Sequence, residues 1–246
     1  MDLFGLGFLL LFGALIFVFS ILYRIQKRSN LRRIPAFQQL RRAIDLAVED
    51  GTRVHVSLGR ADITGPNSAA ALAALTLLHR VTQISADSDK PPVVTAGDGA
   101  LAILSQDTLR SAYQSLGTLH NYSPTYGRAA GLTPFSYAAG TFPVIREENV
   151  SANLLLGTFG HELALISTAA GSKPVVTLAG SDSLPAQAIL FATADEQLIG
   201  EEVYAAGAYV DGEPMHIASL RAQDVIRWLL VAFILLYPIL VLLNFA

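Results

Sequence analysis

The chain of 246 residues is 52% hydrophobic and only 15% charged, whereas a soluble domain of this size usually has about a quarter charged residues. The net charge of −3 is unevenly distributed, because residues 24–42 carry +7 and residues 43–220 carry −10. The high apolar and low charged content indicates a membrane protein. The acidic body is a poor binder of nucleic acid, so we expect no nucleic-acid partner.

The first predicted element is a transmembrane helix over residues 1–23. The 21 residues from Leu3 to Tyr23 contain no charge, and as a helix they span about 30 Å, the thickness of the hydrocarbon core of a bilayer. Basic residues follow this run rather than precede it, and no small-residue cleavage site intervenes. We therefore expect an uncleaved anchor and not a signal peptide.

A basic juxtamembrane segment with an amphipathic helix is predicted over residues 24–50. Lys and Arg next to an apolar helix fix its topology and contact lipid headgroups. This role is expected for Arg24, Lys27, Arg28, Arg32 and Arg33. A specific site for a lipid or another polyanion is the alternative.

Residues 51–220 are predicted to form one α/β domain from two β-α-β half-repeats, 51–118 and 151–210. The segment Ile84-Ser85 and Pro92-Val93-Val94-Thr95 recurs, offset by 82 residues, as Ile166-Ser167 and Pro174-Val175-Val176-Thr177. Duplication explains this match, and chance similarity over a short span is the alternative. Right-handed crossovers would make the four predicted strands parallel, which indicates a Rossmann-like three-layer fold. A helix is expected from Leu184 to Gly200, and a further helix from Glu201 to Val210.

An excursion over residues 119–150 separates the half-repeats. It contains three tyrosines, three glycines and three prolines in 32 residues, a composition that predicts neither a regular helix nor a central strand. Its aromatic residues argue against disorder. We expect an ordered segment that packs on a neighbour or covers an edge of the sheet.

A second transmembrane helix is predicted over residues 224–246. Trp228 stands where the apolar run begins, a usual place for an interfacial aromatic, and Pro238 is tolerated in membrane helices. Arg221 and Arg227 precede the run. Because Lys and Arg remain in the cytoplasm, both termini are expected outside and the central domain in the cytoplasm.

Candidate chemical groups follow the predicted strands, where open α/β sheets bind ligands. They are Asp62, Asp98, His161, Glu162 and Asp182. Together they could bind a divalent cation or act as general acid and base. Each acid also has a structural role, because a carboxylate at a strand-to-helix junction caps free backbone N–H groups. We expect that structural role and assign no catalytic residue.

Sequence fingerprints of cofactor sites are missing. Neither GxGxxG nor GxxxxGK[ST] occurs, and Gly65, Asn67 and Ser68 are the candidates for holding an anion at a helix start. There is no GxSxG elbow, and the lack of cysteine excludes a thiol nucleophile. We expect no cofactor, and no metal site is assigned.

Two uncharged, alanine-rich helices bear on the class of function. They lie within residues 68–78 and 186–194. A helix that is apolar all round must be buried, either within one subunit or between the sheet and another subunit. We predict a non-enzymatic module that forms a homo-oligomer or scaffolds a membrane complex. The alternative is a metal- or nucleotide-dependent enzyme that uses the strand-end carboxylates.

Three stretches carry a resemblance to a known family: Gly97-Asp98-Gly99-Ala100, Gly157-Thr158-Phe159-Gly160-His161-Glu162 and residues 215–224. The order of features resembles an uncharacterised family of bacterial membrane proteins with an α/β domain between two terminal transmembrane helices. The resemblance covers most of the chain and implies a bacterial inner-membrane location, but it brings no activity.

Overall fold

The computed structural model describes residues 3–26, 31–65, 68–86, 88–171, 173–210, 212 and 214–244, which fall into two compact units. Unit 1 comprises the two ends of the chain, up to residue 32 and from residue 211. Unit 2 comprises Arg33–Val210.

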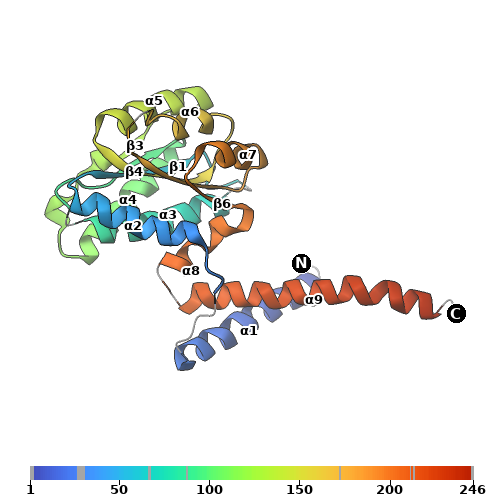
Figure 1. Ribbon diagram of the computed structural model, residues 1–246. Helices are drawn as coiled ribbons and strands as arrows, with labels where there is room; N and C mark the ends of the chain where they lie inside the picture. The colour runs from blue at the N-terminus through green and yellow to red at the C-terminus, as the bar shows by residue number, and fades with distance from the viewer. Residues whose placement is uncertain are drawn as a thin grey trace. The chain divides into compact units, whose positions relative to one another are not determined.

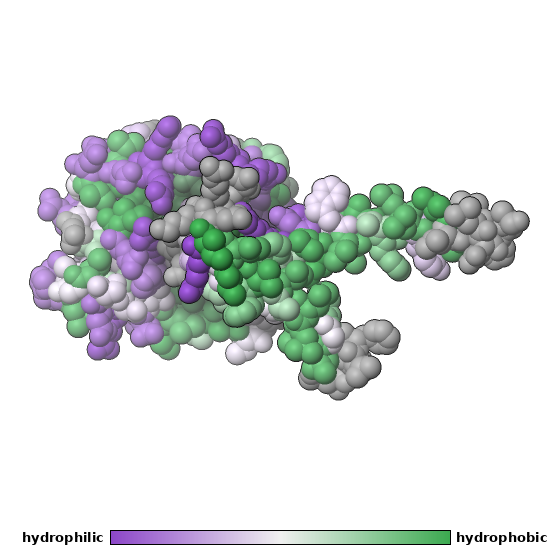
Figure 2. Space-filling model, turned by 90° about the horizontal axis from the view of Figure 1, so that it is seen from below, coloured by the Kyte–Doolittle hydropathy of each residue, from purple (hydrophilic) through white to green (hydrophobic). Residues whose placement is uncertain are grey.

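Unit 1 is built from two long helices, α1 (Leu3–Gln26) and α9 (Pro214–Asn244), which contact each other (Figure 1). Both are long and apolar enough to cross a membrane, over Gly5–Ile25 and Pro214–Ile239. Hydrophobic side chains cover most of the visible surface of these helices in Figure 2. The prediction of an apolar helix at each end of the chain is therefore confirmed.

Unit 2 contains a six-stranded sheet in which every neighbouring pair of strands is parallel. The strands are β1 (Arg53–Gly59), β2 (Val93–Ala96), β3 (Gly127–Ala129), β4 (Val150–Thr158), β5 (Val176–Ser181) and β6 (Glu196–Ile199). Their order, β3-β2-β1-β4-β5-β6, is that of the Rossmann fold. The order reverses between β1 and β4, so the topological switch point lies between these two strands.

Helices cover both faces of the sheet, which confirms the predicted three-layer α/β architecture (Figure 1). One layer contains α2 (Pro35–Glu49), α3 (Ser68–Ser85), α4 (Gly99–Ser115), the 3-10 helix η3 (Gly200–Ala205) and α8 (Ala206–Val210). The other contains α5 (Pro134–Glu147), α6 (Leu163–Ser167) and α7 (Leu184–Thr193). Two short 3-10 helices, η1 (Leu119–Asn121) and η2 (Pro124–Tyr126), connect α4 to β3.

The central strands are buried on both faces, and their residues alternate between two cores. Val54, Val56 and Leu58 of β1 belong to the larger apolar core under α2, α3 and α4. Burying each such side chain contributes about 1.5–3 kcal/mol. His55 and Ser57 lie between them in sequence and therefore point to the opposite face, beneath α5.

The alanine-rich helix α3 is mostly buried within the unit. Its buried residues include Ala71, Ala74, Leu75 and Leu78. It packs on the sheet and on α2, α4 and α8. Leu72 is 53% exposed, so one unit covers most of α3 but not all sides of it.

The predicted helix from Leu184 to Gly200 is wrong in its second half. Helix α7 ends at Thr193, and β6 follows as an edge strand of the sheet. Asp195 causes the change, because its backbone N–H donates to the Thr177 carbonyl at 2.9 Å and its carboxylate accepts from the Thr177 N–H at 2.8 Å. These two bonds place the chain alongside β5.

The excursion over residues 119–150 is ordered and covers an edge of the sheet as expected, but it also contains a regular helix. Strand β3 pairs with β2 at the edge, and α5 is the crossover to β4. Helix α5 begins with a capping box, in which Thr133 Oγ1 accepts from the Ser136 N–H and Ser136 Oγ accepts from the Thr133 N–H. Pro134 at the first helical position favours the same start.

Two glycines allow β1 and β4 to approach closely at their carboxyl ends. Gly59 has φ +70°, and a Cβ atom there would overlap the carbonyl oxygen of Thr158. A Cβ atom at Gly157 would overlap the carbonyl oxygen of Leu58. The pairing register shifts at this place, between Ser57 and Gly59. The close approach at the switch point therefore requires residues without side chains.

Gly59→Ala is expected to destabilise the protein more than Gly51→Ala. Gly51 has φ +60° but nothing within 4 Å of the added Cβ atom, so this substitution costs only the left-handed conformation, about 1–2 kcal/mol. At Gly59 the clash with Thr158 adds about 1–3 kcal/mol. Chemical unfolding of both variants in mild detergent measures the difference, and equal losses would contradict the close approach.

Candidate functional site

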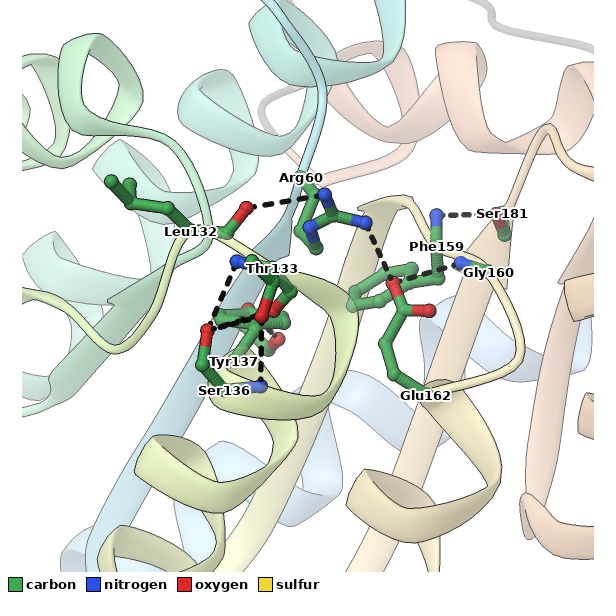
Figure 3. Close-up of polar contacts among 10 residues, drawn as sticks. Arg60, Leu132, Thr133, Ser136, Tyr137, Phe159, Gly160, Glu162 and Ser181 are labelled. Carbon is green, nitrogen blue, oxygen red and sulfur yellow. Dashed lines mark hydrogen bonds and ion pairs between the residues drawn. The ribbon is translucent and has the colours of Figure 1, made fainter.

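Arg60 crosses the switch point at the carboxyl end of the sheet. It follows β1 directly, and its Nη2 atom donates to the Leu132 carbonyl oxygen at 3.2 Å, in the loop before α5. Its Nη1 atom lies 3.8 Å from Glu162 Oε1 (Figure 3). A Cβ atom at Gly97 would overlap the Arg60 side chain, so the arginine stem lies directly on this glycine. Arg60 thus links the loops that follow β1, β3 and β4.

Glu162 is the buried partner of Arg60. Its side chain is 1% exposed, and Oε1 accepts a hydrogen bond from the Gly160 N–H at 3.0 Å. A Cβ atom at Gly160 would lie 2.6 Å from Oε2, so the carboxylate also requires glycine there. A buried carboxylate is costly unless a cation and hydrogen-bond donors accompany it. Arg60 and the Gly160 N–H supply both.

Asp182 follows β5 and is held by two hydroxyl groups. Thr158 Oγ1 donates to Asp182 Oδ1 at 3.0 Å, and the Tyr204 hydroxyl donates to Oδ2 at 3.3 Å. Burial and the neighbouring Asp182 carboxylate raise the pKa of Tyr204. The adjacent Ser181 Oγ accepts from the Phe159 N–H at 3.4 Å, which ties the ends of β4 and β5 together (Figure 3).

The remaining predicted acids have local roles. Asp98 caps α4 by accepting from the Leu101 N–H at 2.9 Å. Asp62 accepts from the N–H and the hydroxyl of Thr64, both at 2.9 Å, and these hydrogen bonds lower the pKa of Asp62. His161 is exposed. The structure therefore brings Glu162 to Arg60 and Asp182 to Thr158, while Asp62 and Asp98 shape their own turns.

The described part of the chain contains no group of three or more His, Asp or Glu side chains that could hold a metal ion. At the predicted anion site, the Gly65 N–H donates to the Asp62 carbonyl and the Ser68 N–H to the Gly65 carbonyl, so both donors are used locally. Asn67, together with Lys27 and Arg28 of the basic segment, lies outside the described residues.

The other members of the basic segment are placed. Arg24 lies in the last turn of α1, and Arg32 and Arg33 are exposed residues between α1 and α2. Their predicted contact with lipid headgroups remains a prediction.

A buried polar network lies beneath α5, next to the switch point. His55 Nδ1 is 2.7 Å from Asn153 Oδ1, and His55 Nε2 is 2.9 Å from Thr95 Oγ1. The amide oxygen can only accept, so Nδ1 carries the proton and Nε2 accepts from the threonine hydroxyl. Tyr137 completes the network, since its hydroxyl donates to the Thr95 carbonyl at 3.2 Å and lies 2.5 Å from Ser57 Oγ.

Burial determines the protonation of this network. Loss of solvent lowers the pKa of His55 from 6.5 to about 4, so the imidazole is neutral at physiological pH. Burial also raises the pKa of Tyr137, which keeps its hydroxyl protonated. All five side chains are fully buried. The network therefore joins β1, β2, β4 and α5 through neutral hydrogen bonds.

The sequence contains a signal for this network, but it does not reveal the partners. His55 and Ser57 are polar residues two apart within a strand that is otherwise apolar, so they share one face. Their partners come from β2, β4 and α5, which lie 40–98 residues away. Tyr137 was not identified, because it lies in residues 119–150, for which no helix was predicted.

A separate cavity of about 300 Å³ lies between β2, β3 and α5. Its charged lining residues are Arg128, Glu147 and Glu148. Glu148 is paired with Arg128 and also accepts from Arg53 Nη1 at 2.6 Å. None of the candidates from the sequence lines this cavity.

Comparison with known proteins gives one family and no characterised relative. A family model described as "Domain of unknown function (DUF6754)" matches residues 3–246. No curated protein and no solved structure matches the chain.

His55 predicts an acid-sensitive stability. In the unfolded chain His55 titrates near 6.5, and in the folded protein near 4. Its contribution is therefore fully present above pH 6.5 and is lost as the pH falls toward 4, because the unfolded chain then binds the proton more readily. The loss amounts to about 3 kcal/mol.

Unfolding of the wild type and of His55→Gln in mild detergent, measured between pH 7.5 and 4.5, checks this contribution. Carboxylates and the other histidines titrate equally in both proteins, so the difference between the two pH profiles isolates His55. Parallel profiles would contradict a buried neutral imidazole.

Proposed function

We propose that this chain, which belongs to the DUF6754 family of domains of unknown function, is a membrane-anchored, non-enzymatic module that assembles with further copies of itself. The observation that carries the proposal is the outer surface of unit 2, where the nearly uncharged helices α5, α6 and α7 leave large hydrophobic side chains exposed. Contiguous exposed apolar surface of this kind marks interaction sites in folded proteins.

The filled switch point supports a role without catalysis. Rossmann-type sheets bind ligands in the crevice beyond the carboxyl ends of their strands. In this chain Arg60 crosses that place and pairs with Glu162. Asp62, Asp98 and Asp182 are engaged in turns, a helix cap and contacts with hydroxyl groups. To act on a substrate, these carboxylates would first have to break their hydrogen bonds and ion pairs within the protein.

The two apolar helices support the anchor. Each has the length and composition of a membrane span, and together they hold unit 2 at both ends of its chain. Confinement to a membrane raises the effective concentration of neighbouring copies, as a linker does for tethered modules. Under this proposal the basic residues that follow α1 place unit 2 in the cytoplasm, with both termini outside.

Orientation is testable because the chain contains no cysteine, so a single introduced thiol is labelled without background. We expect Asp2→Cys to react with a membrane-impermeant maleimide in intact spheroplasts. Ser111→Cys, on the exposed side of α4, should react only after permeabilisation. The wild type is the unlabelled control. The reverse pattern would contradict the orientation, and recovery of the chain in the soluble fraction would contradict the anchor.

Assembly is tested by the mass of the full-length protein in mild detergent. Light scattering coupled to size-exclusion chromatography should give a defined multiple of the 26.3 kDa chain after subtraction of the detergent. The multiple should persist on dilution over a tenfold range. A stable monomer at every concentration would contradict the proposed function.

A further inference from the structure

Five exposed hydrophobic residues of one layer lie on three neighbouring helices, whose outer side is here called the α5–α6–α7 face. Helix α6 contacts both α5 and α7, so the three helices lie side by side (Figure 1). The large hydrophobic residues of the face are 39–79% exposed: Phe135, Phe142, Leu165, Leu184 and Phe191. On α5 and on α7 the two exposed residues are seven positions apart, which puts them on the same side of the helix.

The face contains few charged residues, and the nearest, Arg146, has its guanidinium carbon 5.4 Å from the centre of the Phe142 ring. No charged residue occurs in 134–145, 163–170 or 184–194, which together make up α6, α7 and all but the last turn of α5. Charged residues lie at its border: Arg146 is in the last turn of α5, Lys173 follows α6, and Asp195 follows α7. An apolar centre with a charged rim is the usual anatomy of a protein interface.

The opposite layer differs in this respect. Helix α2 carries Arg41, Arg42 and Asp45, and α4 carries Asp107 and Arg110. Figure 2, which views the molecule from the side of α2, α3 and α4, shows hydrophilic side chains interspersed over unit 2. Exposed large hydrophobic residues also occur in that layer, one on each of α2, α3 and α4 and separated by charges: Leu46, Leu72 and Ile103.

The α5–α6–α7 face is not needed to bury the core of the unit. The inner sides of the same helices provide Tyr137, Ile166 and Leu190, which pack with Leu155 and Ala179 of the sheet. The outer residues are therefore hydrophobic for a reason outside the fold of one unit.

We propose that this face is covered by the same face of a second copy of the chain, related by a two-fold axis. The inference rests on the proposed function and adds the surface and the partner. In an isologous contact the same patch of both copies forms the interface, so an excess of one charge on the patch would be repelled by the same excess on the other copy. Unit 2 carries eleven basic and sixteen acidic side chains, a net charge of −5, so two units repel each other in general. A contact centred on α6 and α7, which carry no charged residue, lets them meet without burying that charge.

A lipid surface fits the face less well. Surfaces that dock on membranes combine apolar residues with a polar side rich in Lys and Arg, and α5, α6 and α7 contain one basic residue, Arg146. The chain also enters unit 2 at α2 and leaves it at α8, both of which pack in the layer on the other side of the sheet.

Disruption of the face tests the inference in the full-length protein. Phe191→Glu places a charge in the centre of the apolar surface, and Ile103→Glu places the same charge at an equally exposed position on α4. Loss of an aromatic anchor and burial of a charge should raise the dissociation constant of the dimer by at least about 10-fold. The α4 variant should leave it unchanged. Circular dichroism and thermal unfolding verify that both variants fold like the wild type.

Cross-linking in native membranes gives a second measurement. A bismaleimide should join two copies through Ala188→Cys, an exposed small residue of α7 between Leu184 and Phe191, and should not join them through Ser111→Cys on α4. Ala188→Cys combined with Phe191→Glu should lose the cross-linked dimer.

The possible results distinguish a wrong interface from a wrong proposed function. An oligomer that survives Phe191→Glu and is cross-linked only through Ser111→Cys would overturn this interface but retain self-assembly. A wild type that is monomeric in detergent and is not cross-linked in membranes would overturn the proposed function as well. A monomer that binds a different protein through the face, and loses it in Phe191→Glu, would show that the occupant is not a second copy.

Discussion

The close approach of β1 and β4 at their carboxyl ends is the constraint on which the carboxyl edge of unit 2 depends. Gly59 and Gly157 permit it, and the Arg60 N–H then donates to the Thr158 carbonyl at 2.9 Å. This bond fixes where the Arg60 side chain starts, and Gly97 leaves room for its stem. Because the strands are this close, one arginine reaches both Leu132 and the buried Glu162. The close approach of the two backbones therefore places the Arg60 side chain across the switch point.

The same two strands separate the larger apolar core from a second core that combines apolar residues with a buried polar network. On the side of α2, α3 and α4, branched and small apolar residues fill the space in the manner of most parallel sheets. On the side of α5, His55, Asn153, Thr95, Ser57 and Tyr137 bond to one another. Hydrogen bonds are directional where apolar contacts are not, so this network fixes the position of α5 against the sheet. The outer side of α5 in turn forms one border of the α5–α6–α7 face.

Sequence patterns predicted the parts of the fold that have a strong local signal. The repeated Pro-Val-Val-Thr segments correspond to β2 and β5, which occupy equivalent positions in the two halves of the sheet. Strands β3 and β6 were missed because they have three and four residues and only one fully buried position each. Such edge strands exist through pairing with β2 and β5 and have no periodicity of their own. Arg60 was missed as a bridging residue because its partners lie 72 and 102 residues away in the chain.

The burial of the two alanine-rich helices, α3 and α7, depends on their tertiary neighbours and could not be predicted from their composition. Their alanine-rich stretches, 68–78 and 186–194, lack charge, and both helices were expected to be buried. Helix α3 has neighbours on several sides, so its small residues are covered within the unit. Helix α7 borders the outer strands and α6, and its outer side is left with Leu184 and Phe191 exposed. A contact that is too small to hold two freely diffusing domains together can suffice for domains confined to one membrane, because their relative concentration is already high. An anchored unit therefore needs only a modest apolar face to assemble, and the α5–α6–α7 face has that character.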